Sequence, residues 1–214
     1  MASVTDPPPD PATVRVSVEV EPYRPDTGAI SWWDDDTVIR LSVLEQPERT
    51  VVVSANPAGL LSTARHLLTL AQESVPDGRH LDFDSYSGWL EPGSLALRVE
   101  VEKKPGQPGV PWSTPPTGAD GSTAQISVDV DPGPAGGTPS SRWEPAALLR
   151  LEVWDSPEPT AVVSGNPAGL VSMARHLLTL AKESVPDGRH LDFGSDCGSL
   201  ADDSMALRIE ATGP

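Results

Sequence analysis

Cysteine is almost missing from this sequence. Cys197 is the only cysteine among 214 residues, so the chain cannot form an internal disulfide and nothing in it indicates an oxidising compartment. No apolar run approaches the roughly 18 residues of a membrane span, and the first residues lack the basic and apolar regions of a signal peptide. We therefore expect a cytoplasmic protein that does not contact the membrane.

Basic residues are also scarce. The chain has 15 Lys and Arg against 31 Asp and Glu, a net charge of −16. Residues 1–110 hold 9 basic and 17 acidic residues and residues 111–214 hold 6 and 14, so each half carries −8. Such a field repels nucleic acid and attracts cationic partners, although acidity also serves solubility alone. We expect no nucleic-acid partner.

The common cofactor motifs are absent. The sequence has no P-loop, no G-x-G-x-x-G, no G-x-S-x-G and no Cys/His set with metal-ligand spacing. We therefore expect no cofactor and no resident metal.

One helix-like segment occurs twice. "NPAGLLSTARHLLTLA" begins at Asn56 and "NPAGLVSMARHLLTLA" at Asn166, 110 residues later. At this offset 28 of 32 positions agree between 52–83 and 162–193, whereas only 12 of 37 agree between 14–50 and 124–160. Tighter constraint on the middle segment and gene conversion both explain this difference, and the sequence leaves both open.

The repeat sets the expected domains. Each unit of about 90 residues is just long enough for its own core. We expect a disordered tail at 1–12, a first α+β repeat at 13–103, a Pro/Gly-rich linker at 104–123 and a second α+β repeat at 124–214.

The periodicities predict the elements of each repeat. "VRVSVEV" from Val14 alternates like a half-buried strand, and four further apolar segments read as strands, two before and two after the helix. Asn56 is a suitable N-cap, Pro57 suits the first helical position, and the helix must end before Pro76. The predicted fold class is α+β. In each repeat one amphipathic helix lies on a mainly antiparallel sheet of about five strands, and the repeats form a pseudo-twofold dimer within a monomeric chain.

The predicted helices carry matching polar faces. At 100° per residue His66 lies away from the apolar stripe of Leu60, Ala64 and Leu67, which predicts that it faces solvent. This face is a candidate partner-binding surface, and a merely solvated helix face is the alternative. Its candidate contact residues are Arg65, His66, Glu73, Arg175, His176 and Glu183.

The repeated "HLDF" places a histidine and an aspartate on one side of a strand, as His80 with Asp82 and as His190 with Asp192. Such a pair suits general acid–base work, and two pairs meeting across the pseudo-twofold axis suit a divalent metal. The alternative is the polar outer face that any sheet with one covered side requires.

"SWWDDD" from Ser31 joins tryptophans to an acidic run. Trp33 matches Trp143 of the second repeat, which predicts a shared packing role. An exposed aromatic beside acidic residues suits a basic partner, and it equally suits a loop folded onto its own domain. The partner-binding candidates that only the first repeat carries here are Trp32, Asp34, Asp35 and Asp36.

The segments "VVVSANPAGLLSTARHLLTLA", "GRHLDF" and "EPGSLALRVEV" resemble the immunity protein 32 family of bacterial polymorphic toxin systems. The likeness covers about 51–101 and 162–209, and the second repeat departs from it with "DDS" where the first has "PGS". The resemblance implies a small α+β domain that binds and neutralises a toxin, and it assigns no active site.

Three functions remain at this point. The first is a non-enzymatic, immunity-like module whose acidity favours a basic toxin as its protein partner. The second is a small-molecule-binding protein or small enzyme, with His80/Asp82 or His190/Asp192 transferring protons at a site between the repeats. The third is an accessory subunit. An enzyme needs a pocket into which those pairs converge, whereas a binder presents them on an open surface.

Overall fold

The computed structural model describes residues 13–29, 32–103, 123–130 and 142–213. Each repeat contains three strands, a helix and two strands, in the order predicted from the periodicities. In the first repeat these are β1 (Val14–Val20), β2 (Ile39–Leu44), β3 (Thr50–Ala55), α1 (Pro57–Leu70), β4 (His80–Phe83) and β5 (Ala96–Val101). In the second they are β6 (Ala124–Val130), β7 (Leu149–Trp154), β8 (Thr160–Gly165), α2 (Pro167–Leu180), β9 (His190–Phe193), the short 3-10 helix η1 (Ser195–Cys197) and β10 (Ala206–Ala211). The expected tail and nearly all of the expected linker lie outside the described residues.

The α+β class and the two similar repeats are confirmed, but the repeats exchange strands. One four-stranded sheet has the order β2-β3-β10-β9 and the other β4-β5-β8-β7, so each sheet takes two strands from each repeat. The strands from different repeats meet in parallel at the centre, with Ala206 opposite Thr50 and Ala96 opposite Thr160. The expectation that each helix lies on a five-stranded sheet of its own repeat is therefore wrong.

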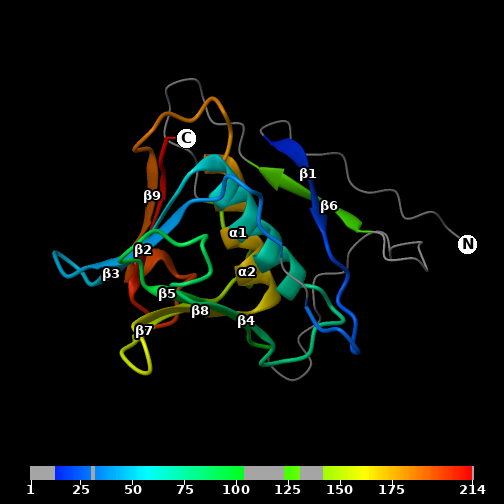
Figure 1. Ribbon diagram of the computed structural model, residues 1–214, viewed down its shortest axis with the longest axis horizontal. Helices are drawn as coiled ribbons and strands as arrows, with labels where there is room; N and C mark the ends of the chain where they lie inside the picture. The colour runs from blue at the N-terminus through cyan, green and yellow to red at the C-terminus, as the bar shows by residue number, and fades with distance from the viewer. Residues whose placement is uncertain (1–12, 30–31, 104–122, 131–141, 214) are drawn as a thin grey trace, which may run out of the picture.

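The first strands of the two repeats form a third sheet. β1 and β6 pair antiparallel, and Val14 faces Val130 while Val20 faces Ala124, so the pairing is the same when the repeats are interchanged. Figure 1 shows this two-stranded ribbon on one side of the helices and the four-stranded sheets on the other. Its inner face is buried, through Val18, Val20, Ile126, Val128 and Val130.

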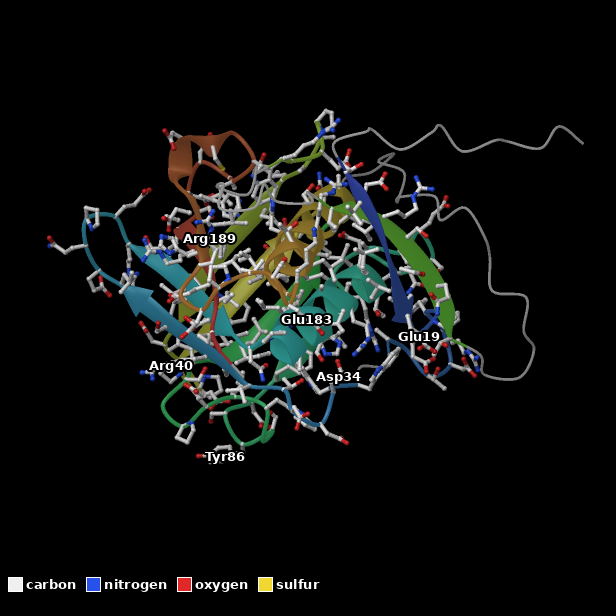
Figure 2. All side chains as sticks on the ribbon, turned by 90° about the horizontal axis from the view of Figure 1, so that it is seen from above. Glu19, Asp34, Arg40, Tyr86, Glu183 and Arg189 are labelled. Atoms are coloured by element: carbon white, nitrogen blue, oxygen red, sulfur yellow. The ribbon has the colours of Figure 1, made fainter. Side chains whose placement is uncertain are left out.

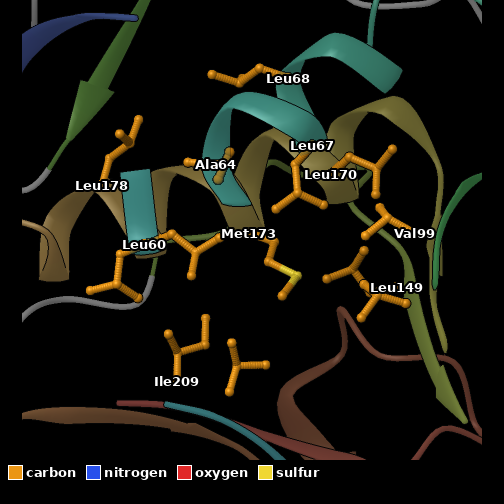
Figure 3. Packing of buried hydrophobic residues seen from close by; sticks show 14 of the residues in the cluster. Leu60, Ala64, Leu67, Leu68, Val99, Leu149, Leu170, Met173, Leu178 and Ile209 are labelled. Atoms are coloured by element: carbon orange, nitrogen blue, oxygen red, sulfur yellow. The ribbon is translucent and has the colours of Figure 1, made fainter. Parts of the chain in front are cut away.

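The helices occupy the middle of the molecule and pack against each other. Leu60, Ala64 and Leu67 are fully buried, as the predicted apolar stripe requires. Figure 3 shows Met173 of α2 pointing toward the sheets, where Leu149 and Ile209 lie. Because the ribbon covers the side of each helix that faces away from the sheets, both helices are buried nearly all round.

Each helix begins as its sequence predicts. The Asn56 side chain accepts a hydrogen bond from the Gly59 amide at 2.8 Å, and Asn166 does the same for Gly169. Asn56 also accepts from the Val38 amide and donates to the Asp36 carbonyl, so it joins the helix to the chain entering β2. Gly59 allows this approach, since a Cβ there would lie 2.6 Å from the Val38 carbonyl oxygen.

The outer edges of β2 and β7 are covered by the loop between the last two strands of the same repeat. Ile39 donates its amide to the Trp89 carbonyl, and Leu95 donates to the Leu41 carbonyl. The second repeat has the equivalent bonds from Leu149 to Ser199 and from Met205 to Leu151. These bonds satisfy edge groups that would otherwise be open to pairing with another chain.

Candidate interaction surface

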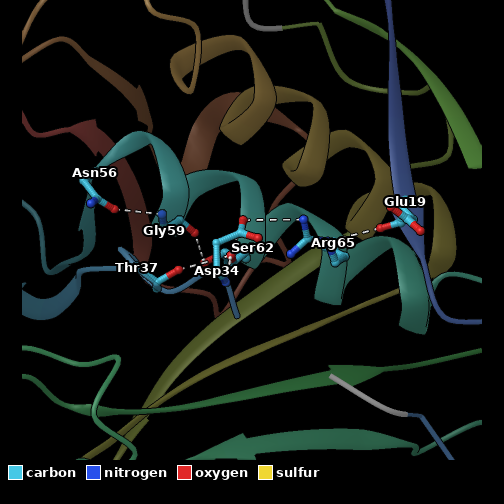
Figure 4. Close-up of polar contacts among 8 residues, drawn as sticks. Glu19, Asp34, Thr37, Asn56, Gly59, Ser62 and Arg65 are labelled. Atoms are coloured by element: carbon cyan, nitrogen blue, oxygen red, sulfur yellow. Dashed lines mark hydrogen bonds and ion pairs between the residues drawn. The ribbon is translucent and has the colours of Figure 1, made fainter. Parts of the chain in front are cut away.

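The expected polar face of α1 forms an internal network. Ser62 donates to the Asp34 carboxylate at 3.1 Å, and the Arg65 guanidinium lies 3.5 Å from the same carboxylate (Figure 4). Arg65 also donates to the Glu19 carbonyl of β1 at 3.1 Å and is 7% exposed. The network ties the acidic loop and the ribbon to the helix.

The same helix face is engaged in the second repeat. The Arg175 guanidinium pairs with the Glu144 carboxylate, and the Glu144 amide donates to Ser172. Of the six residues predicted to form the contact face, only Glu73 and Glu183 are exposed, while Arg65, His66 and His176 are buried and Arg175 is largely covered. The prediction of a solvent-facing surface here is wrong, because it assumed that only one side of each helix is covered.

The two helix histidines lie in aromatic boxes. The His66 ring centre is 4.3 Å from that of Trp33 and 5.0 Å from that of Phe83. His176 has the same relation to Trp143, at 4.9 Å, and to Phe193, at 4.8 Å. The structure thus confirms the shared packing role expected for Trp33 and Trp143.

Both of these histidines are neutral near pH 7. His66 is 1% exposed and His176 2%, and the Nε2 atom of each has no hydrogen-bond partner among the described residues. Burial, and secondly the adjacent Arg65, lowers the pKa of His66 from 6.5 to about 3. Burial and Arg175 lower the pKa of His176 to about 3 in the same way.

The predicted His-x-Asp pairs do form. The His80 Nε2 lies 3.5 Å from an Asp82 oxygen, and His190 lies 3.5 Å from Asp192. Each aspartate is also paired with an arginine of the neighbouring strand, Asp82 with Arg98 at 3.4 Å and Asp192 with Arg208 at 2.6 Å. The carboxylates are therefore already held by guanidinium groups.

The two pairs belong to different sheets. His80 lies on β4 and His190 on β9, each at the edge of its own four-stranded sheet. No group of three or more His, Cys, Asp or Glu side chains that could hold a metal ion occurs in the part of the chain that the structure describes. The geometry gives no support to a metal shared by the two pairs.

The acidic loop, which carries Trp32, Trp33 and the aspartates of 34–36, borders a recess of about 580 Å³. We call this recess the aromatic recess. Tyr86 is 90% exposed and lies at the outer edge of the molecule in Figure 2. Trp33 stacks with Trp89 at 6.2 Å between ring centres. The recess is lined by Trp32, Trp33, Asp82, Phe83, Asp84, Tyr86, Ser87 and Trp89.

Sequence reasoning found Trp32 and the nearby aspartates but missed the other half of this recess. Tyr86 and Trp89 lie in "DSYSGWLEPGS", which reads only as a Gly- and Pro-containing loop. The available signal was the contrast with "GSDCGSLADDS" of the second repeat, where both aromatic residues are missing. Of the remaining predicted residues of the acidic run, Asp34 is half-buried, and Asp35 and Asp36 are exposed.

A second recess, of about 600 Å³, lies beside the start of α2, between the end of β5 and the segment that enters β7. Its lining includes Glu102, Lys103, Leu148 and Asn166. Neither His80 nor His190 lines this recess or the aromatic recess, so neither recess joins the two residues of a predicted acid–base pair.

Comparison with protein families agrees with this architecture. The model of immunity protein 32 matches the chain twice, over residues 50–102 and 160–212. Each repeat therefore contains one immunity protein 32 segment. The resemblance drawn from "NPAGL" and "HLDF" is thus confirmed, as a tandem copy. No curated protein and no solved structure matches the chain.

The immunity protein 32 segments coincide with the exchanged part of the fold. The first match begins with β3 and ends just after β5, and the second spans β8 to β10. Each segment therefore contributes strands to both four-stranded sheets, while β1 and β2 and their counterparts lie outside the match.

In the part of the chain that the structure describes, neither helix has the length and the apolar character that a membrane span needs.

Proposed function

We propose that this chain binds a toxin protein and neutralises it without catalysing a reaction. The observation that carries the proposal is the match of both repeats to immunity protein 32. A protein partner follows from the family at the level of class. Neutralisation, and the nature of the toxin, are the further steps that we propose here.

The charge of the chain favours a basic toxin. The net charge is −16, and complementary charge speeds the association of proteins and disfavours wrong partners. The acidic loop with the aromatic recess is the contact surface that we propose. It replaces the helix face, because Arg65 and His66 are buried there.

Affinity capture from the native host, read by mass spectrometry, tests this proposal. We expect one basic protein in stoichiometric yield, and co-expression with this chain should restore the growth of cells that produce the captured protein. A variant with Tyr86→Ala should capture less of it, while Glu73→Ala, at an exposed position just after the end of α1, should capture the same amount. A captured protein whose toxicity persists in the presence of this chain would refute neutralisation.

A further inference from the structure

The aromatic recess belongs to the first repeat alone. Both repeats keep the inner wall, because Trp33 and Phe83 correspond to Trp143 and Phe193 at the offset of 110 residues. The outer wall differs between the repeats at each position where the first repeat has an exposed aromatic side chain or a carboxylate without a cationic partner. There Trp32, Asp84, Tyr86 and Trp89 correspond to Arg142, Gly194, Asp196 and Ser199.

The walls of the recess are held in place before any ligand arrives. Trp33 packs edge-on against His66 and Phe83 and stacks with Trp89, whose carbonyl accepts the Ile39 amide at 3.1 Å. The Arg65 guanidinium carbon lies 4.6 Å from the Trp32 ring centre and holds that ring against the helix. A preformed site loses less conformational entropy on binding than one whose side chains must first be ordered.

The charges around the recess are negative. Asp84 accepts the amide of Tyr86 at 3.0 Å, and no cation among the described residues pairs with its exposed carboxylate. Asp82 is 58% exposed and shares its charge with Arg98 and His80. Aromatic faces next to an unpaired carboxylate attract a cation, by the ring quadrupole and by direct charge.

We propose that the aromatic recess binds an arginine side chain of a basic partner protein. The planar guanidinium stacks on indole rings and can donate hydrogen bonds to Asp84 at the same time. The chain already makes this kind of contact twice, with Arg65 over Trp32 and with Arg98 5.4 Å from the Trp154 ring centre. The identity of the partner rests on the proposed function, whereas the chemistry of the recess does not.

The direct test is a titration of the whole chain with N-acetylarginine amide, followed through the indole N–H signals in ¹⁵N–¹H spectra. The signals of Trp32 and Trp89 should shift saturably, and that of Trp143 should stay still because the second repeat lacks the outer wall. N-acetylcitrulline amide has the same shape without the charge and should bind about tenfold more weakly. N-acetyllysine amide should also bind more weakly, since it lacks the flat face. Equal binding of the citrulline or lysine ligand, or an equal shift of Trp143, would overturn the assignment.

Two variants each remove one aromatic side chain from the outer wall and leave the charge of the recess unchanged. Tyr86→Ala truncates a side chain that is 90% exposed, so the fold should stay intact and the spectrum should show it. Trp89→Ser removes the stacking partner of Trp33. Each should weaken arginine binding about five- to tenfold. The matched control Asp196→Ala, at the place that corresponds to Tyr86, should leave binding unchanged.

These measurements need no toxin, so their failure is distinct from that of the proposed function. If arginine amide binds as expected and no toxin is captured from the host, the recess stands and the neutralising role falls. If a toxin is captured equally well by Tyr86→Ala and Trp89→Ser, and arginine amide gives no saturable shift, the neutralising role stands and the arginine site is refuted.

Discussion

Lowering the pH from 7 to 5 should destabilise this protein through two buried imidazoles. His66 and His176 have a pKa of about 3 in the folded chain, against an ordinary value of 6.5 that applies once the chain unfolds. Between these values the unfolded chain binds more protons than the folded one. The stability that comes from keeping these histidines neutral is therefore fully present above pH 6.5 and is lost progressively as the pH falls toward 3. At pH 5 the difference is about 1.5 pH units per histidine at 1.36 kcal/mol each, or about 2 kcal/mol. The two together should remove about 4 kcal/mol.

Urea unfolding followed by circular dichroism at pH 7 and pH 5 measures this loss. The double variant His66→Leu/His176→Leu keeps an apolar side chain in each aromatic box and removes the titrating group. Its free energy of unfolding should change by less than about 1 kcal/mol between the two pH values.

The matched control replaces the other two histidines. His80 and His190 have side chains that are 38% and 44% exposed, so His80→Gln/His190→Gln should keep the full loss of about 4 kcal/mol. The reasoning would be refuted if the leucine variant lost as much stability as the unmodified chain. The opposite result would refute it equally, namely that His80→Gln/His190→Gln keeps its stability at pH 5 while the leucine variant loses it.

Three further outcomes follow from the fold. Residues 13–103 expressed alone should form a dimer in light scattering, because β3 and β5 would lack the strands with which they pair; a stable monomer would contradict the exchange. Asn56→Ala should lower the free energy of unfolding, measured in urea, by about 2 kcal/mol, since three backbone groups lose their partner. Asn56→Asp should lower it by less, because a carboxylate still accepts from the Val38 and Gly59 amides. Gly59→Ala should cost about 1 to 3 kcal/mol in the same assay, because the new Cβ would meet the Val38 carbonyl oxygen at 2.6 Å; an unchanged midpoint would show that the chain entering β2 moves aside freely.

The local part of the fold was predictable from the sequence. Capping by Asn56, proline at the first helical position and the apolar spacing fix where each helix begins and which residues form its core stripe. The pairing of strands was not predictable in the same way. β3 and β8 agree at four of six positions and differ only between small or apolar residues, so the sequence of β10 does not choose between them, and only the packing of the whole chain decides.

The burial of His66 escaped prediction for a related reason. A helical wheel shows which side of a helix is apolar, but Ser62, His66 and Thr69 are covered by elements distant in the sequence. Thr69 satisfies its hydroxyl on the Arg65 carbonyl, which lets a polar side chain be buried at little cost. The alternating valines of β1 contained the hint, since their apolar side needs a surface on which to pack.

The aromatic recess was half visible. Trp32 and the acidic run stood out as a cluster in the sequence, but Trp89 comes more than fifty residues later and joins them only because its loop returns to the edge of β2. Residues that converge in this way leave no spacing pattern along the chain.

Covalent fusion of two strand-exchanging copies frees each copy's outer loops to diverge. A dimer of identical single repeats would have to present every surface twice, and any new aromatic side chain would appear at both ends of the particle. Here one end carries Trp89 while the other has Ser199, although the helices between them remain almost the same. The fused chain can thus specialise one end for a single target and keep the other as inert support.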